Sequence, residues 1–389
     1  MDADQAGRDG THRMQHAMTE QLERVRRDRL HRDMIALPRK DTRRMAWMSV
    51  DRLSSQWVTA WPTHKVELSY MEMPEVVTTY LGRESPAVRR LVGQQIPCGA
   101  MHARGRTRYC DAHGFELGLA TLPGHTDTEC HDDAGRELFD ILMEARLHIE
   151  LQPAHIFRSL IPIALLMSPG RPHSIIADAL IRAALPAVQT ARGLRRGRAM
   201  LEQALLFDVK TIHANSPHYH SAHARDEQRG AVRHRERRVA PAYIAHAQRL
   251  DAQIYGAGVH HIENRLRSFG DARGLVYGAY GEASDDVHAL IAIAASKLAE
   301  QQWRVAGARS ASEMRSFTTS RCYRRVGLRV VQAFARHRLD RLPFVGCPRS
   351  VVLARRQHLD AAQQPARHAD MTAFFAHQAG PSAPASPAA

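Results

Sequence analysis

The spacing of apolar positions predicts several helices along the chain. Residues 14–37 place apolar side chains at roughly helical spacing among many charged ones, which indicates an amphipathic arm that ends at a proline. An apolar stripe predicts a helix over 131–147, and 222–253 is a charge-rich segment of helical character. A serine able to cap an apolar run predicts a further helix over 284–303.

Four shorter segments have the pattern of β-strands. Residues 147–151 alternate between polar and apolar, and 174–181, 205–212 and 275–280 are apolar runs bounded by turn residues. The order helix, strand, strand, strand, helix, strand, helix predicts an α/β fold, with α+β as the alternative. We expect a small central mixed sheet flanked by helices.

These elements divide the chain into five predicted parts. The core occupies 131–303, and a capping-box pattern at Ser310 opens C-terminal helices that we expect to be interrupted near Gly327. The tail is rich in Gln, Ala, Pro and Ser, which is typical of disorder. The parts are a helical arm at 1–60, a helical and loop segment with a Cys/His cluster at 61–130, the core at 131–303, C-terminal helices at 304–347 and the tail at 348–389.

The charge balance favours a polyanionic partner. The chain has 54 Lys and Arg against 40 Asp and Glu, a net charge of +14, and only four of the basic residues are lysines. Codon usage in a GC-rich genome raises arginine whatever the protein does, whereas phosphate recognition favours arginine because guanidinium binds phosphate bidentately. We attribute the ratio first to codon usage, but the net charge still favours nucleic acid, either DNA or RNA, as the partner.

The composition argues against membrane-spanning and secreted proteins. The longest apolar run, 160–167, has eight residues, whereas ~20 are needed to cross a bilayer. The first thirty residues are charged throughout, unlike a secretory signal. Five cysteines are few and odd in number, which does not suit a disulfide framework. We therefore expect an intracellular protein with no membrane partner and suspect a nuclear location, while the oligomeric state stays open.

The segment 203–211, Gln-Ala-Leu-Leu-Phe-Asp-Val-Lys-Thr, carries the most informative chemistry. In a strand, Asp208 and Lys210 project from one face because side chains alternate. A carboxylate that binds a divalent cation, beside a lysine that stabilises developing phosphate charge, suits metal-assisted hydrolysis. The alternative is an Asp-Lys pair at the edge of a sheet with no chemical role.

Two further acids could join this pair. Asp178 lies in an apolar strand, where an unpaired carboxylate would be costly, so it either reaches an end of the sheet or shares a partner such as Lys210 or a metal. Glu137 lies at the edge of the apolar stripe of the helix over 131–147 and could point along the sheet toward the metal. His131 falls within that stripe, where it could instead be a packed, hydrogen-bonded histidine.

This arrangement resembles the PD-(D/E)xK nuclease core: a helix with an acid, then Asp178 in an apolar strand, then Asp208-Val-Lys210. More specifically, residues 57–346 resemble the tail downstream of the polymerase in reverse-transcriptase-derived retroelement proteins of protists. The segments that carry this resemblance are Trp57 to Pro62, the Cys/His stretch, His131-Asp132, Leu205 to His213 and Gly274 to Glu282. Ala177 replaces the proline expected before Asp178.

The resemblance implies a restriction-endonuclease-like core with helical extensions and a Mg²⁺-dependent phosphodiester hydrolase. Asp178 and Asp208 would bind the metal, Glu137 would assist, and Lys210 would orient the attacking water and stabilise the transition state. A catalytically inactive nucleic-acid-binding or assembly module is the alternative.

Two other clusters are candidates for binding. Cys98, His102, Cys110 and His113 have spacings that a tetrahedral zinc accepts, although a metal-free loop is the alternative because the chain has 24 histidines. Between the two acidic strands lies a glycine-flanked basic loop that could follow a phosphate backbone or form a solvated insertion. Its basic residues are Arg192, Arg195, Arg196 and Arg198.

Overall fold

The computed structural model describes residues 3–60, 67–97, 108–120, 122, 126–153, 155–162, 177–183, 203–221, 227–348, 350–352 and 354, with only the backbone over 3–15. The larger helices are α1 (Ala3–Ala36), α2 (Thr42–Ser49), α4 (Glu72–Tyr80), α6 (Thr126–Glu144), α11 (Gly230–Glu236), α12 (Val239–Tyr255), α13 (His261–Ser268), α14 (Asp285–Gln302) and α15 (Ala311–Leu339). Shorter helices are α3 (Arg52–Gln56), α5 (Phe115–Gly118), α7 (His155–Arg158), α9 (Pro217–His220), η1 (Trp57–Thr59) and η2 (Leu342–Phe344). The strands are β1 (Gln95–Ile96), β2 (Arg108–Tyr109), β3 (Ile149–Leu151), β4 (Ala179–Ala183), β5 (Gln203–Ile212) and β6 (Arg273–Gly278).

A four-stranded mixed sheet, in the order β3-β4-β5-β6, organises the molecule. β3, β4 and β5 are antiparallel neighbours, whereas β6 runs parallel to β5. A parallel neighbour requires a crossover connection, and α11, α12 and α13 lie between β5 and β6 in the chain. The prediction of an α/β fold with a small mixed sheet and flanking helices is therefore confirmed at this level.

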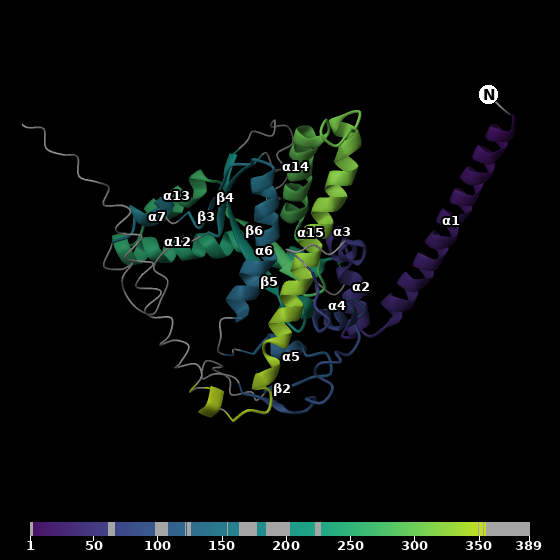
Figure 1. The fold of residues 1–389 in the computed structure, drawn as a ribbon. Helices are drawn as coiled ribbons and strands as arrows, with labels where there is room; N and C mark the ends of the chain where they lie inside the picture. Colours follow the sequence, from purple (N-terminus) through teal and green to yellow (C-terminus); the bar gives the residue numbers. More distant parts are fainter. Residues whose placement is uncertain are drawn as a thin grey trace, which may run out of the picture.

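Helices cover both faces of the sheet. On one face, Phe207 and Val209 of β5 join the largest core cluster with apolar side chains of α6, α14 and α15. On the other face, Leu206 packs with Leu250 of α12 and Ile262 of α13. Figure 1 shows α12 and α13 on the opposite side of the strands from α14 and α15. Alternate side chains of β5 thus pack into the helical layers on the two faces of the sheet.

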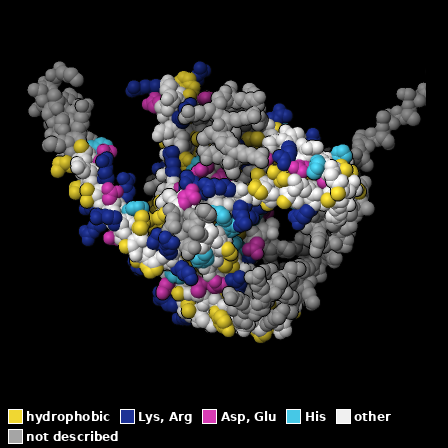
Figure 2. All heavy atoms as spheres, turned by 180° about the vertical axis from the view of Figure 1, so that it is seen from behind, with side chains coloured by type: hydrophobic (Ala, Val, Ile, Leu, Met, Phe, Trp, Pro, Cys, Tyr) yellow, Lys and Arg dark blue, Asp and Glu magenta, His cyan; other side chains and the backbone are white. Residues whose placement is uncertain are grey.

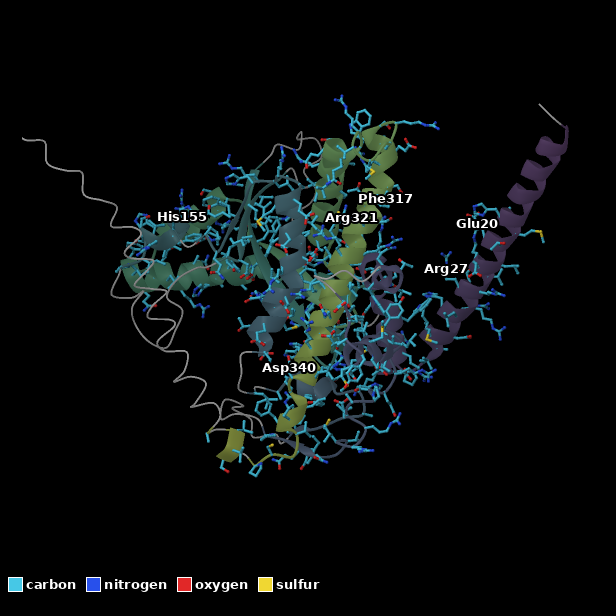
Figure 3. The ribbon with its side chains drawn as sticks, in the orientation of Figure 1. Glu20, Arg27, His155, Phe317, Arg321 and Asp340 are labelled. Carbon is cyan, nitrogen blue, oxygen red and sulfur yellow. The ribbon has the colours of Figure 1, made fainter. Side chains whose placement is uncertain are left out.

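The long helix α15 packs over α6 and α14 and contacts α3. Figure 3 marks Phe317 toward one end of this helix and Asp340 just past the other. The predicted interruption near Gly327 is wrong, because α15 continues through this residue. A Cβ atom at Gly327 would lie 2.6 Å from the carbonyl oxygen of Leu53. The glycine therefore permits the close approach of α3 rather than ending the helix.

The amphipathic arm predicted at 14–37 corresponds to the second part of α1, which begins earlier than expected. Figures 1 and 3 show α1 standing apart from the other helices, with Glu20 and Arg27 along it. Within the segment 222–253, whose helical character the sequence predicts, the described residues form α11 and most of α12, and α13 follows. The predicted disordered tail lies outside the described residues, apart from a few positions near its start.

Candidate functional site

The start of β4 brings Asp178 opposite Asp208 of β5. Ala179 pairs with Phe207 in the antiparallel register, so Asp178, one residue earlier, faces Asp208. The amide of Asp178 donates to the carbonyl of Phe207 at 2.9 Å, and the amide of Val209 donates to Asp178 Oδ2 at 2.6 Å. Residues opposite one another in such a pair project from the same face. The sheet therefore unites the two acids that the sequence singled out.

Lys210 completes this arrangement as predicted. Its Nζ lies 2.8 Å from Oδ1 and 2.6 Å from Oδ2 of Asp208. The side chain of Tyr243, from α12, also hydrogen-bonds the Asp208 carboxylate. Asp208 is 3% exposed, whereas the Lys210 side chain is 30% exposed. The lysine therefore connects a buried carboxylate with the surface.

His131, on α6, is the fifth member of this group. Its Nε2 lies 2.8 Å from the carbonyl oxygen of Val209 and 3.4 Å from Asp178 Oδ2. Its Nδ1 lies 2.9 Å from Asp132 Oδ1. Because β5 extends past the beginning of β4, Asp178 and His131 bind the amide and the carbonyl of Val209 that β4 no longer reaches. We call Asp178, Asp208, Lys210, His131 and Tyr243 the β4–β5 cluster.

The two carboxylates differ in their affinity for protons. Burial raises the pKa of Asp208 despite the neighbouring Lys210 ammonium. Burial also disfavours ionised Asp178, but the hydrogen bond and charge of His131 hold its pKa below the usual value. Although burial opposes the charged imidazole, hydrogen bonds to Asp178 and Asp132 raise the pKa of His131 to about 9. At neutral pH the cluster thus holds two cations beside its acids.

The predicted role of Glu137 has no support in the geometry. Glu137 is buried, and Arg325 of α15 donates to its Oε1 at 2.6 Å. Arg325 also bonds Glu144, one of the last residues of α6. Six residues beyond His131, Glu137 is rotated by about 240° around the helix axis. It therefore faces α15, whereas His131 faces the sheet.

The other predicted sites are only partly described. Cys98 and His102 lie outside the described residues, as do Arg192, Arg195, Arg196 and Arg198. Burial raises the pKa of the Cys110 thiol to about 11, so it stays protonated at neutral pH. His113 Nδ1 lies 3.0 Å from the carbonyl oxygen of Arg83. Within the described part of the chain, neither Cys110 nor His113 joins a group of three metal-ligating side chains.

The structure reveals a group with metal-ligating chemistry that sequence reasoning missed. Asp127, His213 and His337 place one potential ligand atom each within 4.8 Å of the others. Asp127 is one helical turn before His131 on α6, and His213 directly follows β5. The three residues are far apart in the chain, so no local spacing signals the group, and the helix predicted over 131–147 begins after Asp127. We call these three residues the α6–α15 triad.

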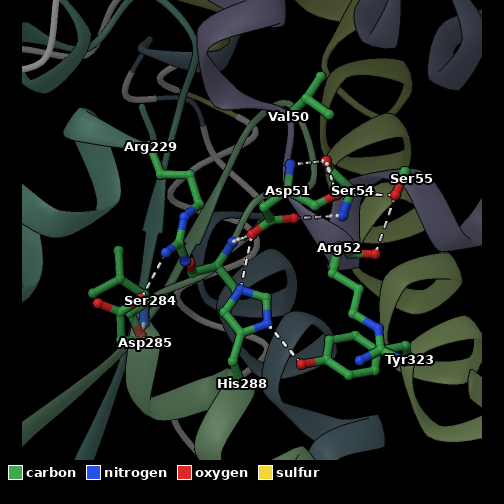
Figure 4. Close-up of polar contacts among 12 residues, drawn as sticks. Val50, Asp51, Arg52, Ser54, Ser55, Arg229, Ser284, Asp285, His288 and Tyr323 are labelled. Carbon is green, nitrogen blue, oxygen red and sulfur yellow. Dashed lines mark hydrogen bonds and ion pairs between the residues drawn. The ribbon is translucent and has the colours of Figure 1, made fainter. Parts of the chain in front are cut away.

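A third polar network fastens α3 to the loop before α14 (Figure 4). Asp51 Oδ2 lies 3.0 Å from His288 Nε2 and accepts the amide of Ala283 at 3.0 Å, while His288 Nδ1 lies 3.0 Å from the Tyr323 hydroxyl. Ser54 forms a capping box with the backbone and carboxylate of Asp51 and does not contact His288. Asp51, His288 and Ser54 are therefore not a serine-hydrolase triad, in which the serine would bond the histidine. The network is best explained as a structural link between α3, α14 and α15.

No family model, curated protein or solved structure matches this chain. None of the described helices is both long and apolar enough to cross a membrane.

Proposed function

We propose that this chain binds nucleic acid and hydrolyses phosphodiester bonds at the β4–β5 cluster, as the resemblance to PD-(D/E)xK nucleases implies. The observation that carries the proposal is the convergence of Asp178, Asp208 and Lys210 from two adjacent strands. We also propose a restriction-endonuclease-like core. Its support is the order α6, β3, β4 and β5, followed by a helical crossover to parallel β6.

The donor set of the cluster suits Mg²⁺. Asp178 and Asp208 offer hard carboxylate oxygens, which this cation prefers, and they would be its protein ligands. Bound there, Mg²⁺ would polarise the phosphoryl group and lower the pKa of an attacking water. Lys210 is the group best suited to stabilise the negative charge that develops on phosphate, because its ammonium is partly exposed. The positive charge of His131 would add to this attraction.

The surface chemistry agrees with a polyanionic substrate. Figure 2 shows basic side chains along α1 and across the described surface of this face, interspersed with acidic ones. The exposed part of α1 carries Arg24, Arg26, Arg27 and Arg29 within six residues. Arginines on a projecting helix can contact phosphates independently of sequence. The retroelement origin is proposed from the sequence resemblance alone, two segments of which, Leu205 to His213 and Gly274 to Glu282, contain most of the adjacent strands β5 and β6.

The experiment compares Mg²⁺-dependent cleavage of DNA and RNA by the wild type and by Asp208→Asn, Asp178→Asn and Lys210→Met. We expect each substitution to lower the rate at least about 100-fold, as loss of a group that stabilises the transition state commonly does. Glu137→Gln is the control, since Glu137 pairs with Arg325 away from the cluster. Equal rates in all variants would remove these residues from the mechanism.

One observation favours the alternative of a catalytically inactive binding module. Both carboxylates already have a cationic partner, Lys210 for Asp208 and His131 for Asp178. Such pairs can be purely structural. This alternative predicts salt-dependent binding of nucleic acid with no cleavage at any Mg²⁺ concentration. A chain that neither binds nor cleaves would contradict both functions.

A further inference from the structure

The α6–α15 triad joins three elements that are far apart in the sequence. Asp127 lies in the first turn of α6, His213 follows β5, and His337 lies in the last turn of α15. His337 Nε2 is 2.9 Å from Asp127 Oδ1, and His213 Nε2 is 3.7 Å from the same oxygen. The two imidazole rings stack with centroids 4.4 Å apart and planes 16° from parallel. Both rings therefore turn the same edge toward the carboxylate.

Burial and neighbouring charges act on all three side chains of the triad. Burial and the positive charges of Arg338 and Arg341 lower the pKa of His337 to about 4. Burial, with neighbouring cations, lowers the pKa of His213 to about 3. Burial opposes ionisation of Asp127, but His337 and Arg341 lower its pKa to about 2. Neutral imidazole and ionised carboxylate are the forms in which these residue types bind metal ions.

Arg341 holds the carboxylate from outside the group. Its Nη2 lies 2.7 Å from Asp127 Oδ1. The same guanidinium is fully buried and donates to the carbonyl oxygens of Leu117, Gly118 and Ala120 at 2.8 to 3.2 Å. Carboxylates that bind metals are commonly oriented by such outer hydrogen bonds. The guanidinium fixes Asp127 in front of the two imidazoles.

We propose that Asp127, His213 and His337 form a binding site for a transition-metal ion of the zinc type. Two imidazole nitrogens favour Zn²⁺, Co²⁺ or Ni²⁺, whereas Mg²⁺ prefers oxygen ligands. This site shares no ligand with the proposed Mg²⁺ site, which would use Asp178 and Asp208. Three protein ligands leave a fourth position for water, and the Asp127 side chain is 58% exposed, which gives the ion a route from solvent.

The proposed site requires only local movement. Ligands about 2.0–2.1 Å from a tetrahedral zinc stand about 3.3–3.5 Å from one another. The ligand atoms of the triad already lie within 4.8 Å. Metal binding would draw the imidazoles together and fasten α6, the end of β5 and α15 at one point. The His337 side chain is fully buried, and the Nε2 atom that it turns toward Asp127 is the one that would bind the ion.

The test titrates the full, chelator-treated chain with Zn²⁺ in competition with a chromophoric chelator. We expect one tight site in the wild type, at least a 10-fold weaker affinity in Asp127→Asn and His213→Ala, and no competition from Mg²⁺. Circular dichroism verifies that both variants fold. Equal zinc affinity in the wild type and these two variants, or no tight binding at all, would overturn the proposal.

Two matched controls separate this site from the other histidines and cysteines. His155→Ala removes an exposed histidine on α7, and Cys110→Ser removes a candidate ligand of the Cys/His stretch. Both should bind zinc as the wild type does, and loss of the tight site in Cys110→Ser would overturn the proposal. The visible spectrum of Co²⁺ bound to the wild-type chain tests the coordination of the site without any substitution. The intense visible absorption of a four-coordinate ion supports the site, whereas the weak bands of an octahedral ion contradict it.

Discussion

The β4–β5 cluster and the α6–α15 triad lie along the same helix and strand, yet they hold their histidines in opposite states. His131 is one turn from Asp127 on α6. Its contacts with Asp178 and Asp132 raise its pKa to about 9. His213 and His337 are more deeply buried beside Arg338 and Arg341, and their pKa values fall to about 3 and about 4.

This difference shows that the neighbours of a histidine, more than its residue type, decide its chemistry. Burial disfavours the charged imidazole in both places. A pair of carboxylates overcomes burial at His131 and creates a cation that can attract phosphate. Two buried guanidiniums reinforce burial at the triad and leave lone pairs that can bind a metal. The same α6–β5 interface thus supports two different kinds of binding chemistry.

The largest expected effect concerns the neutral histidines of the triad. In chelator-treated protein, lowering the pH from 7 to 5 should remove about 1–2 kcal/mol of folding free energy for each of His213 and His337. An imidazole in the unfolded chain titrates near ~6.5, above both folded pKa values. The unfolded state therefore binds more protons as the pH falls, and the folded state loses stability. Urea unfolding at the two pH values measures this loss.

His337→Gln tests the assignment of this loss to the triad. The variant should lose less stability than the wild type between pH 7 and 5, because its side chain does not titrate. His155→Ala, which removes an exposed histidine, should retain the full dependence. If His337→Gln and the wild type lose the same amount, His337 is not held neutral in the folded chain.

The second prediction has the opposite sign. His131→Gln should lower stability by about 1–3 kcal/mol at pH 6, and this difference should shrink as the pH rises through about 9. The folded pKa is raised, so the stabilisation is complete below the unfolded value of ~6.5 and disappears once the folded imidazole loses its proton. Unfolding of both proteins from pH 6 to 10 gives the measurement. A difference that grows with pH would refute the charged state of His131.

Periodicity made the centre of the β4–β5 cluster predictable. The alternation along β5 placed Asp208 and Lys210 on one face, and the apolar strand around Asp178 required a partner at an end of the sheet. Both expectations follow from local geometry and from the cost of burying a charge. His131 lay within the predicted apolar stripe as a packed histidine. The apolar stripe alone does not predict that His131 contacts two carboxylates, those of Asp132 and Asp178.

Contacts between distant segments account for what the sequence could not provide. The apolar stripe predicts that Glu137 points along the sheet toward the site, but α15 packs against that edge of the helix and supplies Arg325. The triad depends on the same helix, because His337 follows Asp127 by 210 positions in the chain. Helical and strand periods fix which face a residue occupies, whereas the identity of the covering helix is a property of the whole fold.

The smallest effect on stability is expected at Asp208. Asp208→Asn should change the free energy of unfolding by less than about 1 kcal/mol, because the Lys210 side chain is partly exposed and an ion pair open to solvent contributes little to stability. Burial already raises the pKa of Asp208, and the partly exposed Lys210 ammonium can be hydrated when its partner is lost. Asp178→Asn should be more damaging, by about 1–2 kcal/mol, since it leaves the His131 cation without its carboxylate on the sheet.

The two substitutions form a matched pair, with the same change of side chain on facing strands, and urea unfolding at pH 7 compares them directly. They also sharpen the functional test, because both should abolish cleavage while only Asp178→Asn weakens the fold. Should Asp208→Asn prove the more destabilising of the two, Lys210 is a structural partner rather than a cation available to phosphate. The inactive binding module would then be the better account of the β4–β5 cluster.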